Sequence, residues 1–512
     1  MHIHFIAICG TGMGSLAQML KASGHKVSGS DSNIYPPMST LLKDTGIVCQ
    51  PGFAPQNIDS DIDLVVIGNA VSSSNVEVQE VLRRNIPYLS FPQALARFFL
   101  KDRSPIVITG THGKTTTSAL MAWVLESAGR DPGMLIGGWA KNFLGGSKIG
   151  SGPYFVVEGD EYDTAFFDKG PKFLHYMPRW AILTSIEFDH GDIYKSLEQI
   201  KSAFQAFVML LPSTGMLVAA QEDPHVADVI QDLDCTIVRY GLGCGGEGPP
   251  HIGKSEPLAL PVRLRRRARG MGASEDPGSS VPHGPPYIEW SARDIRPRPG
   301  GVRFEVVHQD MALAEVDSPL LGRHNVRNAL AVIAMAHHLG LTIEEIVHGI
   351  VTFQGVKRRQ EVLGVVDDIL IMDDFAHHPT AIRETLAAIR MGFPGRRIWA
   401  VFEPRSATSR RKVFQEDFVH AFAEADQVIV AGLYAPEKIQ PHERLDPVRL
   451  VEDLNRKTQG AQFVPTSDEI VEVLCSRLVP GDIVCLMSSG GFGAIHSKLL
   501  AALQKTRSAS PD

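Results

Sequence analysis

The sequence predicts an α/β protein built from more than one domain. Short apolar stretches of strand length alternate with helical patterns along most of the chain, which is typical of parallel sheets covered by helices. A length of 512 residues exceeds what one hydrophobic core usually serves. Two glycine-rich segments also follow predicted strands, at the position where open α/β sheets bind ligands. These observations favour three domains with ligand sites beyond the carboxyl ends of the strands.

The predicted strands are apolar stretches that end at polar or glycine-rich segments. Segments with helical periodicity separate most of them. The expected strands are His2–Ile8, Leu64–Ile67, Pro105–Thr109, Tyr154–Val157, Trp180–Thr184, Ile398–Phe402, Gln427–Ala431 and Ile483–Met487.

Two positions in the chain have the features of domain boundaries. An amphipathic helical pattern over Phe91–Leu100 ends in the polar residues 101–104, and a strand begins directly afterwards. A second helical pattern ends near Thr352–Gln360, ahead of another series of strands and helices. The expected domains are residues 1–103, 104–353 and 354–512.

One segment of the expected central domain differs from the rest in composition. Residues 243–286 are rich in Gly, Pro and Ser and contain an arginine-rich run at 263–269. Because such a composition rarely forms a packed element, we expect a flexible surface insertion. The arginines could bind an acidic partner, but a solvated loop is the simpler interpretation. We assign them no catalytic role.

Composition and charge argue against several function classes. The chain is 44% hydrophobic and 21% charged, with a formal net charge of −7, so we expect no nucleic-acid partner. No apolar run is long enough to cross a membrane, and the first residues do not resemble an export signal; we expect a cytoplasmic protein. The six cysteines form no C-x-x-C pair, which predicts reduced thiols without a zinc site or a disulfide framework.

The strongest functional pattern is an apolar strand followed by a glycine-containing turn and a helical stretch over Ser118–Ala128, which is the context of a phosphate loop. Gly110 and Gly113 would let backbone N–H groups approach phosphate oxygens, and Lys114 would neutralise the β- and γ-phosphates. The hydroxyl of Thr115 would complete the ligand shell of Mg²⁺. The first glycine of a full G-x-x-x-x-G-K-T motif is missing. ATP is the expected ligand, with a chance turn as the alternative.

Two further strands end in acidic residues. Glu158 begins an acidic run that extends to Asp163, and Glu187 begins another that contains His190. Oxygen ligands at a strand end suit a divalent cation, so Glu158 and His190 could share a metal near the γ-phosphate. Taken singly, acidic strand ends are more often solvated loops, and a lone histidine is more often structural. Their occurrence together with the phosphate loop favours the metal interpretation.

The N-terminal strand leads into a second glycine-rich turn, and the following strand ends near Asp31. This arrangement indicates a dinucleotide-type fold, in which a diphosphate rests on the helix N-terminus. Ser15 stands where the G-x-G-x-x-G pattern has its third glycine. Hydride chemistry with NAD therefore does not follow from this turn.

Five motifs resemble those of the Mur ligase family, and their order and spacing cover nearly the whole chain. They are Gly110–Thr115, Glu158–Glu161, Asp189–His190, Gly322–Ala329 and Asp373–Pro379. The resemblance implies an N-terminal Rossmann-like domain that binds a UDP-sugar and a central phosphate-loop ATPase domain with a mixed sheet. It further implies a C-terminal Rossmann-like domain that closes over ATP and binds a peptide.

Three segments, 31–40, 402–406 and 487–493, are similar to the family members that act in peptidoglycan recycling. The resemblance implies that UDP-N-acetylmuramate and the murein tripeptide L-alanyl-γ-D-glutamyl-meso-diaminopimelate are the substrates. In the reaction that the resemblance implies, the lactyl carboxylate of UDP-N-acetylmuramate would attack the γ-phosphoryl group of ATP to give an acyl phosphate. The peptide amine would then displace phosphate.

The resemblance also implies a role for individual positions. Catalysis would involve Lys114, Glu158, His190, Asp374 and His377. ATP would be bound by Gly110, Thr111, His112, Gly113, Lys114, Thr115, Thr116, His324, Asn325 and Arg359. The UDP-sugar would be bound by Gly10, Thr11, Gly12, Met13 and Asp31, the metal Mg²⁺ by Thr115, Glu158 and His190, and the peptide by Arg405.

The residues alone leave alternatives open at two of these sites. Asn325 could be the N-cap of an apolar helix over Ala329–Leu339, and His377–Pro379 could be a turn that starts a helix. At the level of function, the alternatives are a UDP-N-acetylmuramate–L-alanine ligase, a regulatory ATPase without ligation, and an NAD-dependent oxidoreductase. The phosphate loop argues against the last of these.

Overall fold

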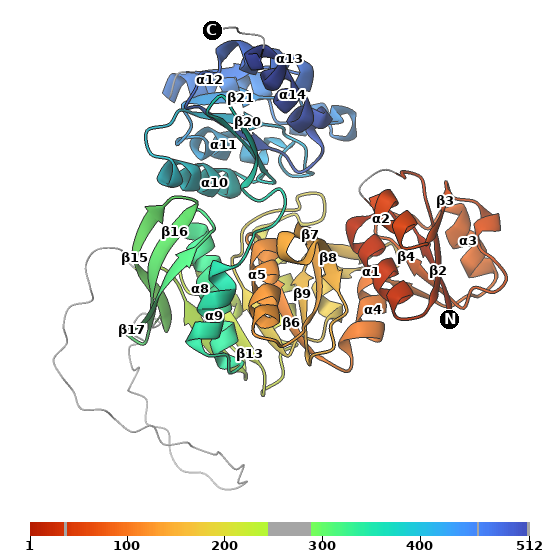
Figure 1. Ribbon diagram of the computed structural model, residues 1–512. Coiled ribbons are helices and arrows are strands. Elements are labelled where there is room, and N and C mark those ends of the chain that lie inside the picture. Colours follow the sequence, from red (N-terminus) through yellow and green to blue (C-terminus); the bar gives the residue numbers. More distant parts are fainter. Residues whose placement is uncertain (35–37, 244–287, 458–459, 509–512) are drawn as a thin grey trace, which may run out of the picture.

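The computed structural model describes residues 1–34, 38–243, 288–457 and 460–508. Three α/β parts follow one another along the chain (Figure 1). Among the described residues each part has its own main sheet, of five, ten and six strands. The predicted α/β class is therefore confirmed. The expected insertion at 243–286, with its arginine-rich run at 263–269, lies outside the described residues except for Gly243.

The N-terminal sheet is parallel throughout and has the strand order β3-β2-β1-β4-β5, which is the order of a Rossmann-like fold. Parallel strands covered on both faces are apolar along their length, and all five residues of β1 are buried. The strands are β1 His2–Ile6, β2 Lys26–Asp31, β3 Val48–Pro51, β4 Leu64–Ile67 and β5 Tyr88–Ser90. The helices are α1 Thr11–Ala22, α2 Met38–Asp44, α3 Val76–Arg83 and α4 Phe91–Leu95, which continues as a π-helical turn, Ala96–Leu100.

The central sheet is mixed, with the order β17-β16-β15-β14-β13-β12-β6-β9-β7-β8. Its strands are β6 Ser104–Thr109, β7 Gly133–Ala140, β8 Gly145–Lys148, β9 Tyr154–Gly159, β12 Trp180–Leu183, β13 Met216–Ala220, β14 Thr236–Tyr240, β15 Trp290–Arg298, β16 Gly301–His308 and β17 Met311–Ser318. A separate hairpin is formed by β10 Asp163–Ala165 and β11 Asp168–Pro171. The helices are α5 Lys114–Ser127, α6 Leu197–Val208, α7 Pro224–Val229, α8 Arg323–His338 and α9 Ile343–Val351.

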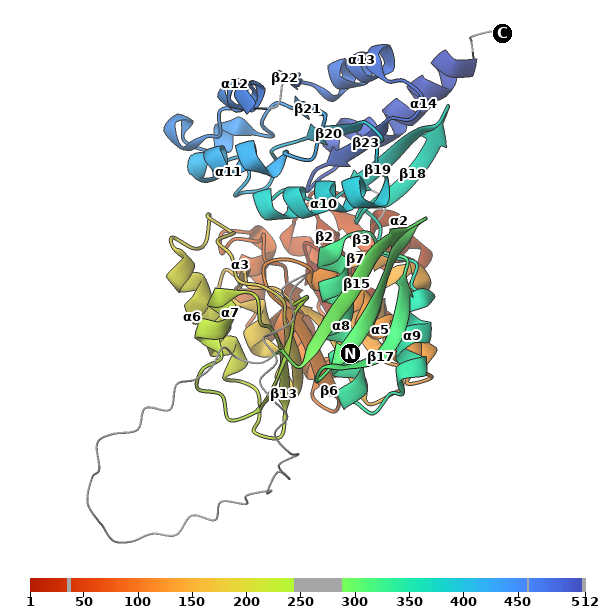
Figure 2. The same cartoon turned by 90° about the vertical axis from the view of Figure 1, so that its left-hand side faces the viewer.

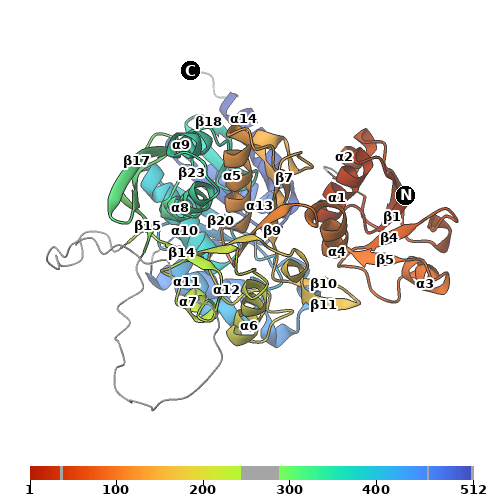
Figure 3. The ribbon, with the colours of Figure 1, turned by 90° about the horizontal axis from the view of Figure 1, so that it is seen from below.

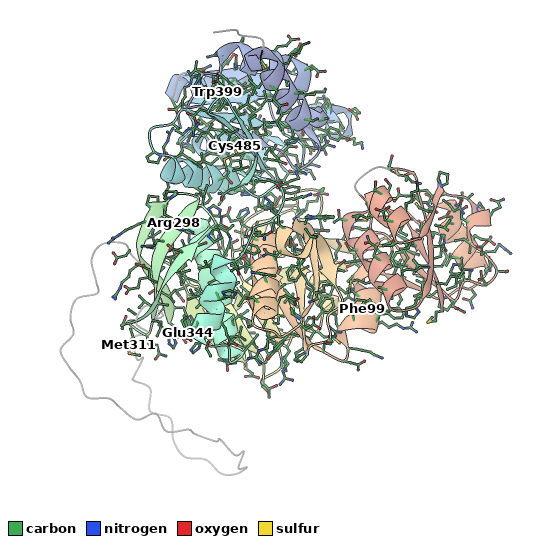
Figure 4. The ribbon with its side chains drawn as sticks, viewed as in Figure 1. Phe99, Arg298, Met311, Glu344, Trp399 and Cys485 are labelled. Carbon is green, nitrogen blue, oxygen red and sulfur yellow. The ribbon has the colours of Figure 1, made fainter. Side chains whose placement is uncertain are left out.

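The C-terminal sheet has the order β18-β19-β23-β20-β21-β22 and is parallel except for the edge strand β18. Its strands are β18 Glu361–Val366, β19 Ile369–Asp374, β20 Ile398–Phe402, β21 Gln427–Val430, β22 Ala461–Phe463 and β23 Ile483–Met487. The helices are α10 Pro379–Gly392, α11 Gln415–Ala421, α12 Pro447–Lys457, α13 Ser467–Arg477 and α14 Ile495–Ser508. Trp399 and Cys485, both fully buried on central strands, mark its core (Figure 4).

Every strand expected from an apolar stretch is present, and where the ends differ they do so by one or two residues. The helix after the phosphate loop begins at Lys114, one turn before the expected start at Ser118. It begins earlier because Gly113 adopts φ 82° and serves as the N-cap. The first turn carries polar residues, so the apolar pattern did not include it.

The N-terminal and C-terminal parts each contact the central part. The N-terminal part lies to one side, with α1 and α4 next to the central part (Figure 3), and one apolar core runs from β1 to the central strands. Phe99 lies at this junction (Figure 4), with its ring centroid 6.5 Å from that of Phe155. The C-terminal part lies above the central part in the view of Figure 1, with α10 facing the central part (Figure 2) and touching α8 and β15. The carboxyl ends of the central strands thus face the C-terminal part.

Two further expectations concern thiols and membrane spans. The cysteines that the structure describes are free thiols. Across the described ranges, no helix combines the length and apolarity that a membrane span requires.

Candidate active site

A cavity of about 800 Å³ lies between the central and C-terminal parts. It collects residues that stand far apart in the sequence. Thirteen of the predicted site residues line it, namely Thr111, His112, Gly113, Lys114, Thr115, Thr116, Glu158, His190, His324, Asn325, Arg359, Asp374 and His377. Gly110, which directly precedes the lining residue Thr111, does not itself line the cavity. Arg405 and the predicted UDP-sugar residues do not line it either.

The turn between β6 and α5 has the backbone of a phosphate cradle. Gly110 and Gly113 have φ values of 130° and 82°, which residues with a side chain rarely adopt. A Cβ at Gly113 would lie 2.6 Å from the amide oxygen of Asn328, and one at Gly110 would clash with Thr184. No side chain caps the first turn of α5, so its N–H groups remain free for an anionic ligand.

Lys114 is held at the floor of this turn by an acidic neighbour. Its Nζ donates to the Gly110 carbonyl at 2.6 Å and to Glu161 Oε2 at 2.9 Å. Burial alone would lower the pKa of Lys114, but the charges of Glu161 and Asp160 raise it. The lysine is therefore a cation within reach of phosphates bound at the turn. Glu161 also lies 3.1 Å from His190 Nε2.

Glu161 is a site residue that the sequence analysis missed. It belongs to the predicted acidic run, but no role was assigned to it. Its side chain is almost fully buried between two cationic partners, Lys114 and His190. Burial would raise the pKa of Glu161, whereas Lys114 and His190 lower it. Its place in the acidic run and in the motif Glu158–Glu161 was the signal in the sequence.

Two of the three predicted metal ligands lie in direct contact. The Thr115 hydroxyl donates to Glu158 Oε1 at 2.7 Å, and the Gly137 N–H donates to Glu158 Oε2 at 2.7 Å. Burial and the nearby charge of Asp160 raise the pKa of Glu158. A hydroxyl beside a half-buried carboxylate that has no cationic hydrogen-bond partner among the described residues fits a hard divalent cation. His190 does not touch Glu158 and pairs with Glu161 instead.

His324 and Asn325 lie in the first turn of α8, which begins at Arg323 after the N-cap Gly322. The interpretation of Asn325 as an N-cap of a helix over Ala329–Leu339 is therefore wrong. Its side chain donates to the Leu321 carbonyl at 2.8 Å. The apolar pattern starts late because the first turn of α8 faces the cavity. Burial lowers the pKa of His324 to about 4, so its imidazole is neutral at neutral pH.

The C-terminal part contributes Asp374 at the end of β19 and the residues that follow it. Asp374 accepts hydrogen bonds from the N–H groups of Gln360 and Ala376, both at 2.7 Å. Its pKa is raised by burial, although the charge of Arg359 opposes this. Arg359 extends across the cavity, and its Nη2 lies 3.3 Å from the Thr115 hydroxyl.

The segment His377–Pro379 is both a helix start and part of the cavity lining. His378 is the N-cap of α10 and accepts from the Thr380 N–H at 3.2 Å, with Pro379 as the first helical residue. The expected turn and helix start are therefore present. His377 contacts the Phe375 carbonyl through Nδ1 at 3.0 Å. Burial lowers the pKa of His377, while the charge of Asp189 opposes this.

Arg405 follows β20 and lies at the margin of the cavity, because its neighbour Ser406 lines it. The guanidinium carbon lies 3.6 Å from the ring centroid of Tyr434, and Nη1 lies 3.5 Å from Glu403. On another side the guanidinium packs against Gly490, where it leaves no space for a side chain. Arg405 is thus held in one orientation and still has an exposed fraction of 25%.

The predicted UDP-sugar residues lie in the N-terminal part, away from the cavity. Gly10 is the N-cap of α1 and provides no side-chain cap, and Thr11 is the first helical residue. Asp31 accepts backbone N–H groups from Cys9 at 2.8 Å and from Asn33 at 2.9 Å. The carboxylate of Asp31 therefore fixes the shape of this turn.

Comparisons with known proteins identify the family of the chain. The model for the Mur ligase family, catalytic domain, matches residues 2–103, the Mur ligase middle domain matches 108–246, and the Mur ligase, glutamate ligase domain matches 358–490. A relative from Haemophilus influenzae is 37% identical over 504 residues, which are 98% of this chain and 99% of the relative. The chain belongs to the Mur ligase family.

Relatives that match nearly the whole chain carry two different names. The Haemophilus influenzae relative and one from Escherichia coli, 36% identical over all of both chains, are named UDP-N-acetylmuramate–L-alanyl-γ-D-glutamyl-meso-2,6-diaminoheptandioate ligases. Mur ligases named UDP-N-acetylmuramate–L-alanine ligases are 31% to 33% identical. A solved murein peptide ligase from Psychrobacter arcticus is 33% identical with a TM-score of 0.68 and covers 98% of both chains.

Proposed function

We propose that this Mur ligase joins L-alanyl-γ-D-glutamyl-meso-diaminopimelate to UDP-N-acetylmuramate, with conversion of ATP to ADP and phosphate. Relatives with this activity in their names match the whole chain at a higher identity than the L-alanine ligases do. In the structure, the supporting observation is one cavity that brings the phosphate loop against Arg359 and Asp374 of the C-terminal part. We further propose that this reaction is a cytoplasmic step of peptidoglycan recycling, because ATP and a UDP-linked sugar are its substrates.

The chemistry requires activation of a carboxylate, because an amine does not displace hydroxide from it at a useful rate. The lactyl carboxylate of UDP-N-acetylmuramate attacks the γ-phosphorus of ATP, which forms an acyl phosphate and releases ADP. The free N–H groups at the start of α5 and the ammonium of Lys114 stabilise the charge on the transferring group. The peptide amine then attacks the acyl carbon, the amide bond forms, and phosphate leaves.

Thr115, Glu158 and His190 are the proposed ligands of Mg²⁺. The ion supplies a positive charge that neutralises the phosphate oxygens. Thr115 and Glu158 already lie together, so they hold this charge beside the turn. His190 would be the third ligand, and in the structure its imidazole pairs with Glu161 instead.

Residues of the C-terminal part complete the site from across the cavity. Arg359 brings a guanidinium to the hydroxyl of Thr115, where it balances charge on the γ-phosphoryl group. Asp374 fixes the backbone next to Arg359 by accepting the N–H of Gln360, and it also accepts the N–H of Ala376. His377 has a lowered pKa because it is buried, so its neutral imidazole accepts a proton from the incoming amine.

The two remaining substrate sites lie outside the phosphate region. The proposed UDP-sugar site is the uncapped start of α1 with residues 10–13, whose shape Asp31 maintains. The proposed peptide contact is Arg405, since its partly exposed guanidinium is held in place and carries the donor pair that binds a carboxylate in bidentate fashion. His324 and Asn325 are the proposed contacts of the adenosine part of ATP.

The proposal is tested by ADP release from UDP-N-acetylmuramate, ATP and Mg²⁺, with the tripeptide, with L-alanine or with neither. We expect turnover only with the tripeptide, and a product whose mass equals both substrates less one water. Turnover with L-alanine alone would assign the chain to the other group of Mur ligases. ADP release that no acceptor increases would indicate an ATPase without ligation.

A further inference from the structure

A second cluster of possible metal ligands lies in the cavity, apart from Thr115 and Glu158. It consists of His112 in the phosphate loop, Glu187 after β12 and His378 at the start of α10, with one ligand atom of each within 4.8 Å of the others. His112 Nε2 lies 3.4 Å from Glu187 Oε2, and His378 Nδ1 lies 3.7 Å from the same oxygen. Ligand atoms bound at tetrahedral Zn²⁺ are about 3.3 to 3.6 Å apart, given bond lengths of about 2.0 to 2.2 Å.

The protonation of the three side chains suits a metal. Burial would raise the pKa of Glu187, but the contact with His112 and the hydrogen bond from the Thr380 hydroxyl, at 2.7 Å, lower it to about 2, so the carboxylate is ionised. Burial and the charge of His112 lower the pKa of His378 to about 4, so its imidazole is neutral. His112 Nε2 is buried and makes no well-formed hydrogen bond to the described residues, although Glu187 lies 3.4 Å away. Because a metal displaces protons from its ligands, two imidazole nitrogens and one carboxylate oxygen can bind it.

Surrounding hydrogen bonds hold these ligands in place. His378 Nε2 lies 3.1 Å from the Phe188 carbonyl, and a donated proton there leaves the lone pair on Nδ1, which is the atom that faces Glu187. Such a bond to a backbone carbonyl is the usual support of a metal-bound histidine. The N–H of Thr380, at 3.2 Å from Nδ1, competes for this lone pair and would lose its partner when a metal binds.

We propose that His112, Glu187 and His378 form a binding site for a divalent transition-metal ion, with Zn²⁺ as the best fit. The site takes a borderline ion because two of its three ligands are imidazoles, whereas Mg²⁺ prefers oxygen. The fourth position is open to water or to a phosphate oxygen. The ion joins the central part to the C-terminal part, because His112 and Glu187 belong to the former and His378 to the latter. Bound Zn²⁺ therefore holds the two parts together.

Co²⁺ is the probe for the test, since it takes the same ligands and absorbs visible light. The metal-free full-length protein is titrated with Co²⁺ in a large excess of Mg²⁺. We expect one equivalent of Co²⁺ to give the intense absorption of four- or five-coordinate cobalt, and Zn²⁺ to displace it. Absorption no stronger than that of hydrated Co²⁺ would overturn the proposal.

Variants separate this site from the proposed Mg²⁺ site. Glu187→Gln and His378→Asn should each weaken Co²⁺ binding by more than about tenfold, because changing a residue that only supports a metal ligand already costs about 10- to 100-fold. Asn at position 378 can still cap α10. Thr380→Val is the matched control and should retain the cobalt absorption, because it removes a hydrogen bond to Glu187 and leaves all three ligands. Glu158→Gln should also retain the absorption. If Glu158→Gln abolishes it and Glu187→Gln does not, the cobalt occupies the Mg²⁺ site and the proposal is wrong.

A measurement on the unaltered chain covers the case that a variant does not fold. X-ray absorption at the zinc edge of the protein with one equivalent of Zn²⁺ should show two imidazole ligands. A shell made only of oxygen, or of a single imidazole, would contradict the assignment. Both tests are independent of ligase activity.

Discussion

The two glycine-rich turns of this chain share a backbone plan and differ in their surroundings. Each follows a parallel strand and opens into a helix whose first turn has no side-chain cap, α1 in the N-terminal part and α5 in the central part. Glu158 and His190 line the cavity beside the turn before α5, and Glu161 contacts His190 there. Around the turn before α1, the nearby carboxylate of Asp31 is bound to the backbone.

The difference shows what each level of structure contributes. A strand, a glycine turn and a helix supply N–H groups that bind an anion, and this much is common to both turns. Chemistry on a phosphoryl group also requires fixed charges that stabilise its transition state. Among the described residues, a lysine paired with a buried carboxylate lies at the turn before α5, whereas the buried carboxylate of Asp31 at the other turn is bound to the backbone. We therefore expect substitutions at this turn to reduce the rate, and those at the other turn to affect binding of the UDP-sugar.

The largest effect is expected for Lys114→Ala. Loss of the ammonium removes stabilisation of the transferring phosphoryl group, so kcat should fall by about 10²- to 10³-fold or more. Binding of UDP-N-acetylmuramate, measured by titration calorimetry, should stay within about twofold of the unaltered protein, because Lys114 lies outside the N-terminal part. A twofold change is well below the 1.4 kcal/mol that corresponds to about a factor of ten. A large loss of UDP-sugar binding would mean that the two turns are not independent.

Glu158→Gln should have the next largest effect. The variant keeps the shape of the side chain and a hydrogen-bond acceptor for Thr115, but it removes the negative charge that attracts Mg²⁺. The Mg²⁺ concentration for half-maximal activity should rise by about 10- to 100-fold. Removal of Mg²⁺ with a chelator should abolish activity in the unaltered protein. Activity of the variant with an unchanged Mg²⁺ dependence would exclude Glu158 as a ligand.

Glu161→Gln tests whether the buried ion pairs position Lys114 and His190. We expect kcat to fall about tenfold, since the loss of one ordering interaction is worth about 1.4 kcal/mol, with a smaller change in KM for ATP. Asp163→Asn is the control, because Asp163 pairs with the exposed Lys169. Equal losses in both variants would show that acidic charge in general, and not the contacts of Glu161, matters.

Thr11→Val should give the smallest effect. The substitution keeps the size of the side chain and removes one hydroxyl at the start of α1. If this hydroxyl binds the diphosphate, KM for UDP-N-acetylmuramate should rise about tenfold or less, while kcat and KM for ATP stay constant. A fall in kcat without a change in KM would contradict a role in binding alone.

The sequence was sufficient for the elements and for most of the cavity lining. Apolar stretches and glycine turns are local patterns, so the strands and both turns could be predicted. The start of α8 could not, because its first turn carries polar residues that face the cavity. The contacts of Glu161 and the cluster of His112, Glu187 and His378 also could not be predicted. They arise only when strand ends and α10 meet in space, and no spacing in the sequence records that.

The central claim is that the cavity activates the lactyl carboxylate as an acyl phosphate. It is tested most directly with UDP-N-acetylmuramate in which both oxygens of this carboxylate are ¹⁸O. One carboxylate oxygen remains on phosphorus when the peptide amine displaces phosphate, so each turnover should release phosphate with one ¹⁸O, detected by mass spectrometry. Phosphate without the label, released at the rate of amide formation, would contradict the proposed mechanism.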